Sequence, residues 1–290
     1  MKDTKTVFVT GATGFVGRHL LAAVIHKRLA NKFNFILLSR REVPVNPDFQ
    51  LVVADLCDED VVRKQVRKSD VVIHLASVLD SSDKNLEKVN VDASLDILRS
   101  LKKGAKFIFL SSATVNYPIK TRYANSKLIV EKRIKESNIN YTIIRPSWIY
   151  GNGSRSFEKL LNYAKNSRVI PVINQMIQPV FVGDVVDLII NSTDKYDRET
   201  IEIAGEKIAY QSFVERIAAF FGKKPLVVRL PYVFFWLLFN ASQILPIKIL
   251  TKDSLVDFEY STNVDLKLLK KKYGVTPKSV DVVLSEKLIE

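Results

Sequence analysis

The chain has 290 residues, a net charge of +13 at pH 7 and one cysteine, Cys57. A single cysteine excludes an internal disulfide and, with no apolar leader-like run before the first glycines, we expect a cytoplasmic protein. The sequence contains no His/Cys cluster, so we expect no metal site. The lysines are dispersed and no zinc-finger, RNP or KH pattern occurs, so we expect no nucleic-acid partner.

Six apolar runs of strand length follow one another in the first half of the chain. They are rich in Val, Ile and Phe and are nearly continuous, as expected for strands of a sheet that is covered on both faces. The runs are residues 6–10, 33–39, 49–56, 70–76, 106–112 and 140–146.

Helix-like segments lie between these runs. Residues 17–30 carry apolar side chains at helical spacing, and residues 58–69 begin with acids and end with bases, which suits the helix dipole. Residues 91–104 end in Lys-Lys-Gly, a helix-stop pattern, and residues 123–138 form another long candidate. The alternation predicts an α/β fold with a doubly wound parallel (Rossmann) sheet and right-handed crossovers.

The regular alternation of strands and helices ends near residue 150. Beyond it, helical stretches and short strands mix, and no polar linker separates the two halves of the chain. We therefore expect a first domain over residues 1–150 and a smaller substrate-binding lobe over residues 151–290 that packs on it.

Residues 231–250 are strongly apolar. The unbroken apolar run covers only residues 232–239, whereas a membrane-spanning helix needs roughly 20 apolar residues. A buried helix is the first interpretation of this segment. The alternative is an interfacial helix that makes a peripheral membrane contact, assisted by the basic charge of the chain.

Three glycines, Gly11, Gly14 and Gly17, separate the first strand from the first helix. Glycine permits a tight turn, lets backbone N–H groups approach a phosphate, and lets helix and strand pack closely. The N-terminus of the helix then offers partial positive charge to a diphosphate. In the first strand–turn–helix of an α/β pattern, this spacing predicts that residues 1–150 bind a dinucleotide.

The second strand ends at Ser39, Arg40 and Arg41. An acid at this place would bind the 2′-hydroxyl of NAD, whereas a guanidinium suits a 2′-phosphate. The sequence therefore favours NADP over NAD, with solvated arginines as the alternative. Asp55 ends the third strand, where it either accepts a hydrogen bond from adenine or serves in a turn.

Tyr123 and Lys127 lie four residues apart, so on a helix they share a face. A tyrosine with its ordinary pKa of about 10 is a poor acid or base at neutral pH, and a nearby ammonium lowers that pKa. Ser112 follows a strand at the edge where ligands bind in such sheets, and its hydroxyl can orient a substrate oxygen. These three residues therefore predict a catalytic site.

Seven motifs occur in the order seen in extended short-chain dehydrogenase/reductases. They are TGATGFVG, HLAS, VNVDAS, FLSSATV, YANSK, RPSWIYGNG and PVFVGDVVDLI. The chain resembles the NAD-dependent epimerase/dehydratase branch of these enzymes, well over roughly residues 5–190 and loosely beyond. The resemblance implies hydride transfer with NAD or NADP, with a nucleotide-linked sugar as the first choice of substrate.

The resemblance also implies roles for individual residues. Tyr123 is the acid/base, Lys127 binds the nicotinamide ribose and tunes Tyr123, and Ser112 positions the substrate. Asn90 matches a family asparagine near the substrate. The remaining implied contacts are to the cofactor: Gly11, Thr13, Gly14, Phe15, Val16 and Gly17 at the phosphates, Asp55 and Leu56 at the adenine, Leu75, Ala76 and Ser77 in the cleft, and Pro146 at the nicotinamide.

The chain departs from the family in two places. The loop between Ser112 and Tyr123 is short, and QMIQP stands where an arginine often precedes the family's FVGD segment. Arg155 is the substitute we expect at the substrate, with Arg168 and Arg229 as further candidates.

Two other functions remain open at this point. One is an NADPH-dependent reductase of a small carbonyl compound. The other is a non-catalytic cofactor-binding subunit associated with a membrane complex. A homodimer also remains open, because nothing in the sequence fixes the oligomeric state.

Overall fold

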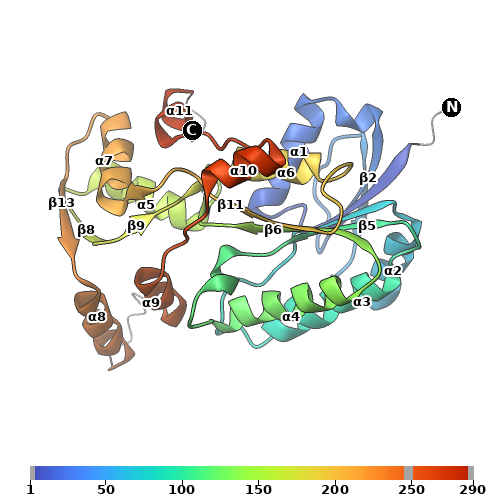
Figure 1. Cartoon of the computed structure of the whole chain (residues 1–290), viewed down its shortest axis with the longest axis horizontal. Helices are drawn as coiled ribbons and strands as arrows, with labels where there is room; N and C mark the ends of the chain where they lie inside the picture. The colour runs from blue at the N-terminus through green and yellow to red at the C-terminus, as the bar shows by residue number, and fades with distance from the viewer. Residues whose placement is uncertain (1–3, 245–250, 287–290) are drawn as a thin grey trace. The chain divides into compact units, whose positions relative to one another are not determined.

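The structure is a computed structural model that describes residues 4–244 and 251–286 (Figure 1). The chain forms two compact units. The first comprises residues up to 115, 122–145 and 185–202, and the second comprises residues 116–121, 146–184 and those from 203 onward. A single boundary at residue 150 therefore does not describe the units. Residues 185–202 return to the first unit because the strand at their end completes its sheet.

A seven-stranded sheet forms the centre of the first unit, in the order β11-β6-β5-β4-β1-β2-β3. The ladders from β3 across to β6 are parallel, which confirms the predicted Rossmann sheet. The strand order reverses between β1 and β4, and ligands bind at the carboxyl ends of strands at such a switch point. The strands are β1 (Lys5–Thr10), β2 (Phe33–Ser39), β3 (Phe49–Val53), β4 (Val71–His74), β5 (Lys106–Leu110), β6 (Asn140–Pro146) and β11 (Glu199–Ile203).

Helices cover both faces of this sheet, as a doubly wound fold requires. Figure 1 shows α2, α3 and α4 on one face and α1 and α6 on the other. A π-helical turn, η2 (Lys88–Asp92), leads into α3 and was not indicated by the sequence pattern. The bounds are α1 (Phe15–His26), α2 (Glu59–Lys68), α3 (Ala93–Ser100), α4 (Arg122–Glu136) and α6 (Val182–Asn191), with short 3-10 turns η1 (Leu29–Asn31) and η3 (Ala113–Asn116).

One part of the core of the first unit lies between the sheet and helices α2, α3 and α4. Phe8 and Phe107 of the strands meet Val66 of α2, Ile97 of α3 and Val130 of α4 in one buried cluster. Each such side chain contributes roughly 1.5–3 kcal/mol on burial. This packing fixes the strand ends, from which the candidate site is built.

His74 is among the polar side chains that lie fully buried in this unit. Its Nδ1 is 2.7 Å from the hydroxyl of Thr10, and its Nε2 is 2.9 Å from the hydroxyl of Ser94. The ring stacks on Phe107 and Phe109. Burial, helped by the positive charge of Lys127, lowers the pKa of His74 to about 3, so the ring is neutral in the folded protein.

We predict that His74 makes the folded state less stable as the pH falls. The unfolded chain takes up a proton on this ring below its ordinary pKa of 6.5, whereas the folded chain does so only near 3. The stability that the neutral ring contributes is therefore lost as the pH drops from 6.5 toward 3. In His74→Gln, the fall in the free energy of unfolding between about pH 7 and pH 5 should be about 2 kcal/mol smaller. Urea unfolding measures it, and equal pH dependence in both proteins would contradict the prediction.

The second unit is built from three short strand pairs and six helices among the described residues. An aromatic cluster of Tyr150, Phe157, Phe181 and Phe213 holds it together. The pairs are β7 (Ile149–Tyr150) with β10 (Val180–Phe181), β8 (Val169–Ile173) with β13 (Leu226–Leu230), and β9 (Met176–Ile177) with β12 (Ile208–Ala209). The helices are α5 (Arg155–Asn166), α7 (Tyr210–Phe220), α8 (Tyr232–Ile244), α9 (Lys252–Glu259), α10 (Leu266–Tyr273) and α11 (Val280–Ser285).

Helix α8 contains most of the apolar segment singled out in the sequence. Phe235 and Phe239 on one side of α8 are buried, so the expectation of a buried helix holds for that side. The opposite side exposes large apolar side chains: Val233, Phe234, Trp236 and Leu237. No described helix is long and apolar enough to cross a membrane. Residues 245–250, the rest of the segment, lie outside the described residues, and the membrane contact stays a prediction.

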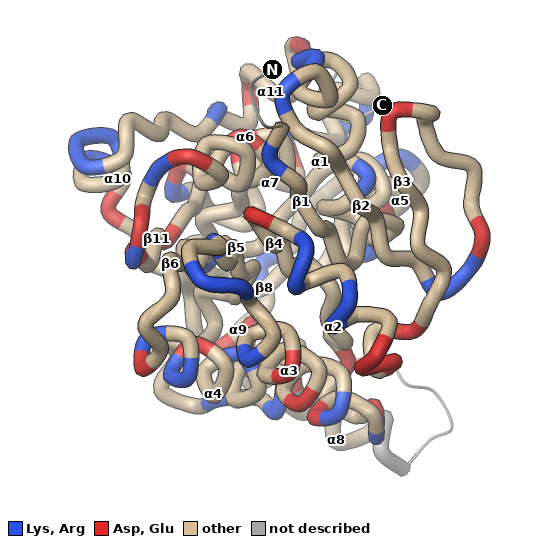
Figure 2. The backbone as a smooth tube through the Cα atoms, turned by 90° about the vertical axis from the view of Figure 1, so that its right-hand side faces the viewer, with Lys and Arg blue, Asp and Glu red and all other residues tan. Residues whose placement is uncertain are grey.

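Charged residues are interspersed along both units, with blue and red segments alternating on the backbone (Figure 2). The densest basic run in a described helix is Lys270–Lys272, at the C-terminal end of α10. Cations at that end suit the helix dipole, so this run has a local structural explanation.

Candidate cofactor and catalytic site

The glycine loop packs directly on the segment that follows β4. Gly11 has a φ of +70°, and a Cβ added to it would lie 2.6 Å from the backbone nitrogen of Ala76. A Cβ on Gly17 would lie 2.3 Å from the carbonyl oxygen of Gly11. Both positions therefore require glycine, because L side chains would collide with backbone atoms.

The N-terminus of α1 suits an anion. The helix starts at Phe15, and its N-cap residue, Gly14, has no side chain to occupy the first N–H groups. The first turn contains no acidic residue. A diphosphate bound here would meet the positive end of the helix dipole, so these residues fit the expected dinucleotide. Thr13 and Gly14 are exposed, and Phe15 is partly exposed.

The segment Leu75–Ser77 lies beside this loop. The backbone N–H groups of Leu75 and Ala76 donate to the carbonyl and hydroxyl oxygens of Thr10, at 3.1 and 3.4 Å. All three residues of the segment are partly exposed. The carboxyl ends of β1 and β4 thus come together at the switch point, and the structure brings these predicted cofactor-lining residues next to the glycine loop.

The ends of β2 and β3 are the places where the sequence predicts the adenosine part of the cofactor. The Ser39 hydroxyl donates to the carbonyl of Arg41 at 2.7 Å, which turns the chain and leaves Arg40 and Arg41 exposed. A carboxylate oxygen of Asp55 accepts from the backbone N–H of Cys57 at 2.8 Å. Asp55 therefore serves in a turn, and a contact to adenine stays a prediction.

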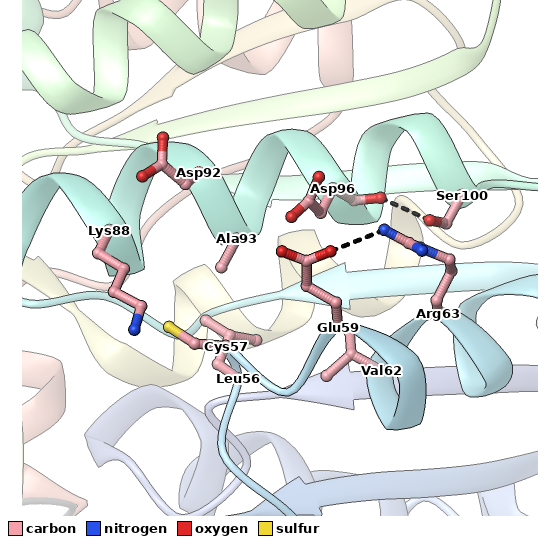
Figure 3. A pocket seen from close by; sticks show the side chains of 10 residues that line it. All are labelled: Leu56, Cys57, Glu59, Val62, Arg63, Lys88, Asp92, Ala93, Asp96 and Ser100. Carbon is pink, nitrogen blue, oxygen red and sulfur yellow. Dashed lines mark hydrogen bonds and ion pairs between the residues drawn. The ribbon is translucent and has the colours of Figure 1, made fainter.

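Figure 3 shows a pocket beside this turn, with a volume of about 130 Å³. Buried Leu56 and partly exposed Cys57 form one wall, and the ion pair between Glu59 and Arg63, at 2.9 Å, lies at another. Because Leu56 is also the residue expected to flank the adenine, the pocket adjoins the predicted cofactor site.

Lys127 is a buried lysine that lies one helical turn from Tyr123. Its side chain is 2% exposed, and its ammonium donates to the carbonyl of Leu110, at the carboxyl end of β5, at 2.9 Å. The ammonium lies 5.8 Å from the centre of the Tyr123 ring and 4.8 Å from that of Phe109. Burial lowers the pKa of Lys127 to about 7, while the negative charge of Glu131 acts in the opposite direction. The charge of this lysine therefore responds to its surroundings near neutral pH.

Two adjacent serines at the end of β5 face different surroundings. The Ser111 hydroxyl is buried and donates to Glu131 at 2.5 Å. The Ser112 hydroxyl is partly exposed and accepts from the backbone N–H and the hydroxyl of Thr114, at 3.2 and 2.9 Å. Ser112 is thus the more accessible of the two serines, and its contact with a substrate oxygen stays a prediction.

A buried ion pair lies one turn beyond Lys127 on α4. Glu131 is 1% exposed, and Arg145 from β6 donates to both of its carboxylate oxygens, at 2.9 and 2.5 Å. Glu202 accepts from the same guanidinium at 3.1 Å. A bidentate guanidinium is the strongest partner available to a buried carboxylate, so this pair locks α4 to the sheet. The sequence did not indicate this pair, because Glu131 and Arg145 belong to different elements and share no local pattern.

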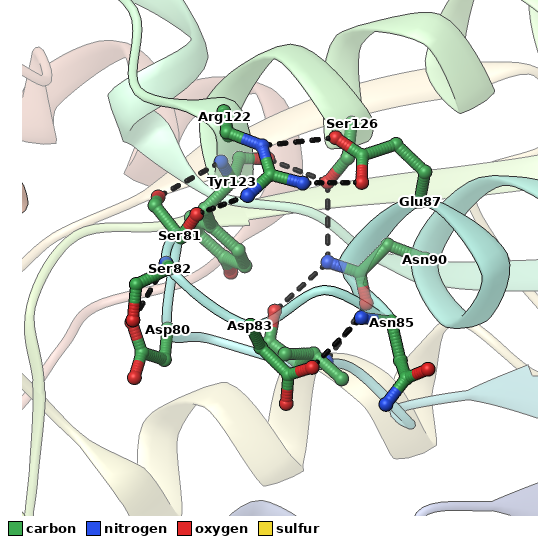
Figure 4. Close-up of polar contacts among 11 residues, drawn as sticks. Asp80, Ser81, Ser82, Asp83, Asn85, Glu87, Asn90, Arg122, Tyr123 and Ser126 are labelled. Atoms are coloured by element: carbon green, nitrogen blue, oxygen red, sulfur yellow. Dashed lines mark hydrogen bonds and ion pairs between the residues drawn. The ribbon is translucent and has the colours of Figure 1, made fainter.

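Asn90 of η2 was expected near the substrate, and the structure places it 1% exposed. Its side-chain carbonyl accepts from the backbone N–H of Val78 at 2.7 Å, and its amide nitrogen donates to the Val78 carbonyl at 2.8 Å (Figure 4). The same nitrogen donates to the hydroxyl of Ser126 at 3.1 Å. These bonds make Asn90 a tie between the chain after β4 and helix α4, and direct substrate contact stays a prediction.

Pro146 and Arg155 belong to the second unit. Pro146 ends β6 and is buried, whereas Arg155 opens α5 and is exposed, as are Arg168 and Arg229. Their roles toward nicotinamide and substrate stay predictions. Among the described residues, no group of three His, Cys, Asp or Glu side chains could hold a metal ion.

These features define a dinucleotide-binding α/β protein with a tyrosine–lysine pair at the carboxyl edge of its sheet. The chain belongs to the NAD-dependent epimerase/dehydratase family, whose model matches residues 7–204. The predicted resemblance is thereby confirmed.

Proteins that are similar to this chain in sequence have different functions. The chain is 27% identical to ceramide reductase of Caulobacter vibrioides, over 78% of this chain and 73% of that protein. It is 29% identical to UDP-glucose 4-epimerase of Vibrio cholerae, over 67% and 68%. It is 26% identical to NADH dehydrogenase [ubiquinone] 1 alpha subcomplex subunit 9 of Dictyostelium discoideum, over 73% of this chain and 62% of that protein.

Solved structures share the fold along nearly the whole chain. UDP-glucose 4-epimerase of Thermotoga maritima, solved with UDP-glucose, has a TM-score of 0.75 at 19% identity and covers 98% of this chain and 97% of its own. dTDP-glucose 4,6-dehydratase of Bacillus anthracis, solved with NAD, has a TM-score of 0.77 at 15% identity, with coverage of 98% and 95%.

We predict that Gly17→Ala damages the glycine loop more than Gly14→Ala does. A Cβ at 17 would overlap the Gly11 oxygen at 2.3 Å, whereas one at 14 would lie 3.2 Å from the same atom. Gly17→Ala should cost about 1–3 kcal/mol of stability, and Gly14→Ala clearly less. Thermal unfolding measures this difference. Calorimetry should show weaker NADH binding in both variants, and unchanged binding in both would contradict the assignment of the loop to the cofactor.

Proposed function

We propose that this protein transfers a hydride between NAD(P) and a carbinol or carbonyl carbon of a nucleotide-linked sugar, with Tyr123 as the acid/base. The observation that carries the proposal is the buried ammonium of Lys127, 5.8 Å from the Tyr123 ring and anchored at the carboxyl end of β5. The glycine loop follows β1 at the same edge of the parallel sheet. This common edge supports the proposal that Tyr123 transfers the proton and that the glycine loop binds the cofactor.

The tyrosine and the lysine would work as a pair. A positively charged Lys127 stabilises the phenolate of Tyr123 relative to the neutral phenol. In the oxidative direction Tyr123 accepts the proton of a substrate hydroxyl, and in the reductive direction it returns a proton to the carbonyl oxygen. Ser112 donates to or accepts from the same oxygen and so orients it. A bound nicotinamide ring would accept or supply the hydride.

Family membership and the named relatives support a sugar nucleotide as the substrate. The Vibrio cholerae relative is a UDP-glucose 4-epimerase, and the Thermotoga maritima structure holds UDP-glucose. Arg155 remains our candidate for the partner of the substrate phosphates. The ceramide reductase relative supports the second candidate, a reductase that consumes its reduced cofactor. Cofactor that stays bound through purification would favour the epimerase or dehydratase, and NADPH oxidation with an added carbonyl compound would favour the reductase.

A non-catalytic role as a subunit of a membrane complex has less support. One named relative is a subunit of NADH dehydrogenase, but this chain retains Ser112, Tyr123 and Lys127, for which a purely structural protein has no need. A cytoplasmic location, a homodimer and a membrane contact through residues 231–250 remain predictions from the sequence.

Tyr123→Phe tests the proposed acid/base directly. The substitution removes the phenolic hydroxyl and keeps the ring beside Lys127, so turnover should fall by at least about 100-fold while NADH affinity stays within about twofold. Turnover of UDP-glucose or of a carbonyl substrate, together with calorimetry, measures the two effects. Full activity of the variant would remove Tyr123 from the mechanism.

Arg40→Ala tests the preference for NADP. If the exposed Arg40 guanidinium binds a 2′-phosphate, its loss should weaken NADP binding about tenfold and leave NAD binding nearly unchanged. Calorimetric titrations with both cofactors provide the comparison, with Arg41→Ala as a neighbouring control. Equal losses for NAD and NADP would show that Arg40 does not discriminate between them.

A further inference from the structure

A loop of residues 78–87 connects the predicted cofactor-lining segment to η2, and it is attached to the start of helix α4 (Figure 4). The attachment involves residues that no motif pointed to. Its centre is Arg122, the first residue of α4 and the direct neighbour of Tyr123.

The guanidinium of Arg122 forms hydrogen bonds to the loop at two places. Its Nε and one Nη donate to the two carboxylate oxygens of Glu87, at 3.1 and 2.5 Å. Its other Nη donates to the backbone carbonyl of Ser81 at 2.6 Å. The planar guanidinium therefore spans the loop from Ser81 to Glu87, a geometry that the point charge of a lysine could not reproduce.

The loop in turn holds the backbone of Tyr123. The Ser81 hydroxyl accepts from the Tyr123 backbone N–H at 3.2 Å, in the manner of a helix N-cap supplied by a distant segment. On the other side, the carbonyl of Tyr123 accepts from the hydroxyl of Ser126 at 2.7 Å, and Ser126 accepts from Asn90. Both backbone polar groups of Tyr123 are thus tied, directly or through Asn90, to the chain that follows β4.

The Arg122–Glu87 pair is exposed to solvent, with 47% and 54% of the two side chains accessible. Exposed ion pairs add little to the global stability of a protein, even though the Arg122 hydrogen bonds lower the pKa of Glu87. An effect of this pair should therefore be local, on the loop and on the residue next to Arg122.

We propose that Arg122 is a positioning residue for Tyr123: by clamping Ser81 and Glu87, it holds the 78–87 loop on the first turn of α4 and fixes the phenol for proton transfer. The proposal rests on the proposed function, because it assumes that Tyr123 is the acid/base. Small displacements of a catalytic group have large kinetic effects, so loosening of the clamp should lower kcat more than it alters binding.

The test uses the full chain with Arg122→Gln and Glu87→Gln, which remove one charge each and keep similar size. The matched controls are Arg133→Gln and Glu136→Gln, which break an exposed ion pair of the same type, 3.1 Å apart, at the C-terminal end of α4. A swapped variant, Arg122→Glu with Glu87→Arg, tests rescue. The measurements are amide hydrogen exchange, melting temperature, NADH calorimetry and steady-state kinetics.

In both clamp variants, exchange of the 78–87 amides and of the Tyr123 amide should rise about 5- to 30-fold, with melting temperatures close to those of the controls. In the same variants kcat should fall about 10- to 100-fold, with KM and NADH affinity within about threefold. The swapped variant should recover part of the loss in kcat. The Arg133 and Glu136 controls should leave both exchange at these amides and kcat unchanged.

Wild-type exchange at the loop and Tyr123 in both clamp variants would overturn the proposal. Increased exchange with unchanged kcat in an active enzyme would also overturn it, because the clamp would then not position Tyr123. If the wild-type protein turned over no substrate, the proposed function would fail by itself. The exchange data and NADH calorimetry would still report whether the clamp holds the loop.

Discussion

The chemistry proposed for this protein depends on one interaction, the hydrogen bond from the ammonium of Lys127 to the carbonyl of Leu110. A lysine side chain that is 2% exposed loses nearly all of its hydration, and this loss lowers its pKa to about 7. The bond to the end of β5 fixes where the charge lies, beside Tyr123 and at the edge where the glycine loop begins. The sheet thus determines the position of the charge, and helix α4 determines the position of the phenol relative to it.

The surroundings of α4 show how such a charge can be held in a buried place. Glu131 lies one turn from Lys127 and is balanced by Arg145 and by the Ser111 hydroxyl. The negative charge of Glu131 stabilises the ammonium of Lys127. Glu131 at the same time accepts hydrogen bonds from Arg145 and Ser111, so Lys127 is not its only partner. Arg122 anchors the other end of the same helix through surface contacts. Helix α4 is therefore held at its start by exposed bonds and in its middle by buried bonds. The exposed bonds add little to global stability and mainly position the start of the helix, whereas loss of a partner in the buried pair would be strongly destabilising.

The sequence predicted the elements that carry regular patterns. The runs at 33–39 and 140–146 coincide with β2 and β6, and the glycine spacing found the loop before α1. It could not predict the return of β11 to the sheet, because Glu199–Ile203 is a short run whose place depends on distant strands. The partners of Arg122 lie 35 and 41 residues away along the chain, so no local pattern indicated them. The turn η2 was also not predicted. Its Asn90 bonds to Val78, which lies 12 residues earlier in the chain, so this contact is not part of a local helical pattern.

Because β11 lies late in the chain, the sheet is completed late during translation. Strand β6 ends at Pro146, and its neighbour at the edge of the sheet is synthesised only at Glu199–Ile203. During translation, the backbone of β6 therefore emerges with one side unpaired, and such an edge is open to pairing with other nascent chains. The residues made in that interval belong largely to the second unit. If translation paused between β6 and β11, the nascent chain would carry an incomplete sheet. We therefore expect slow synthesis across these residues to lower the yield of native protein.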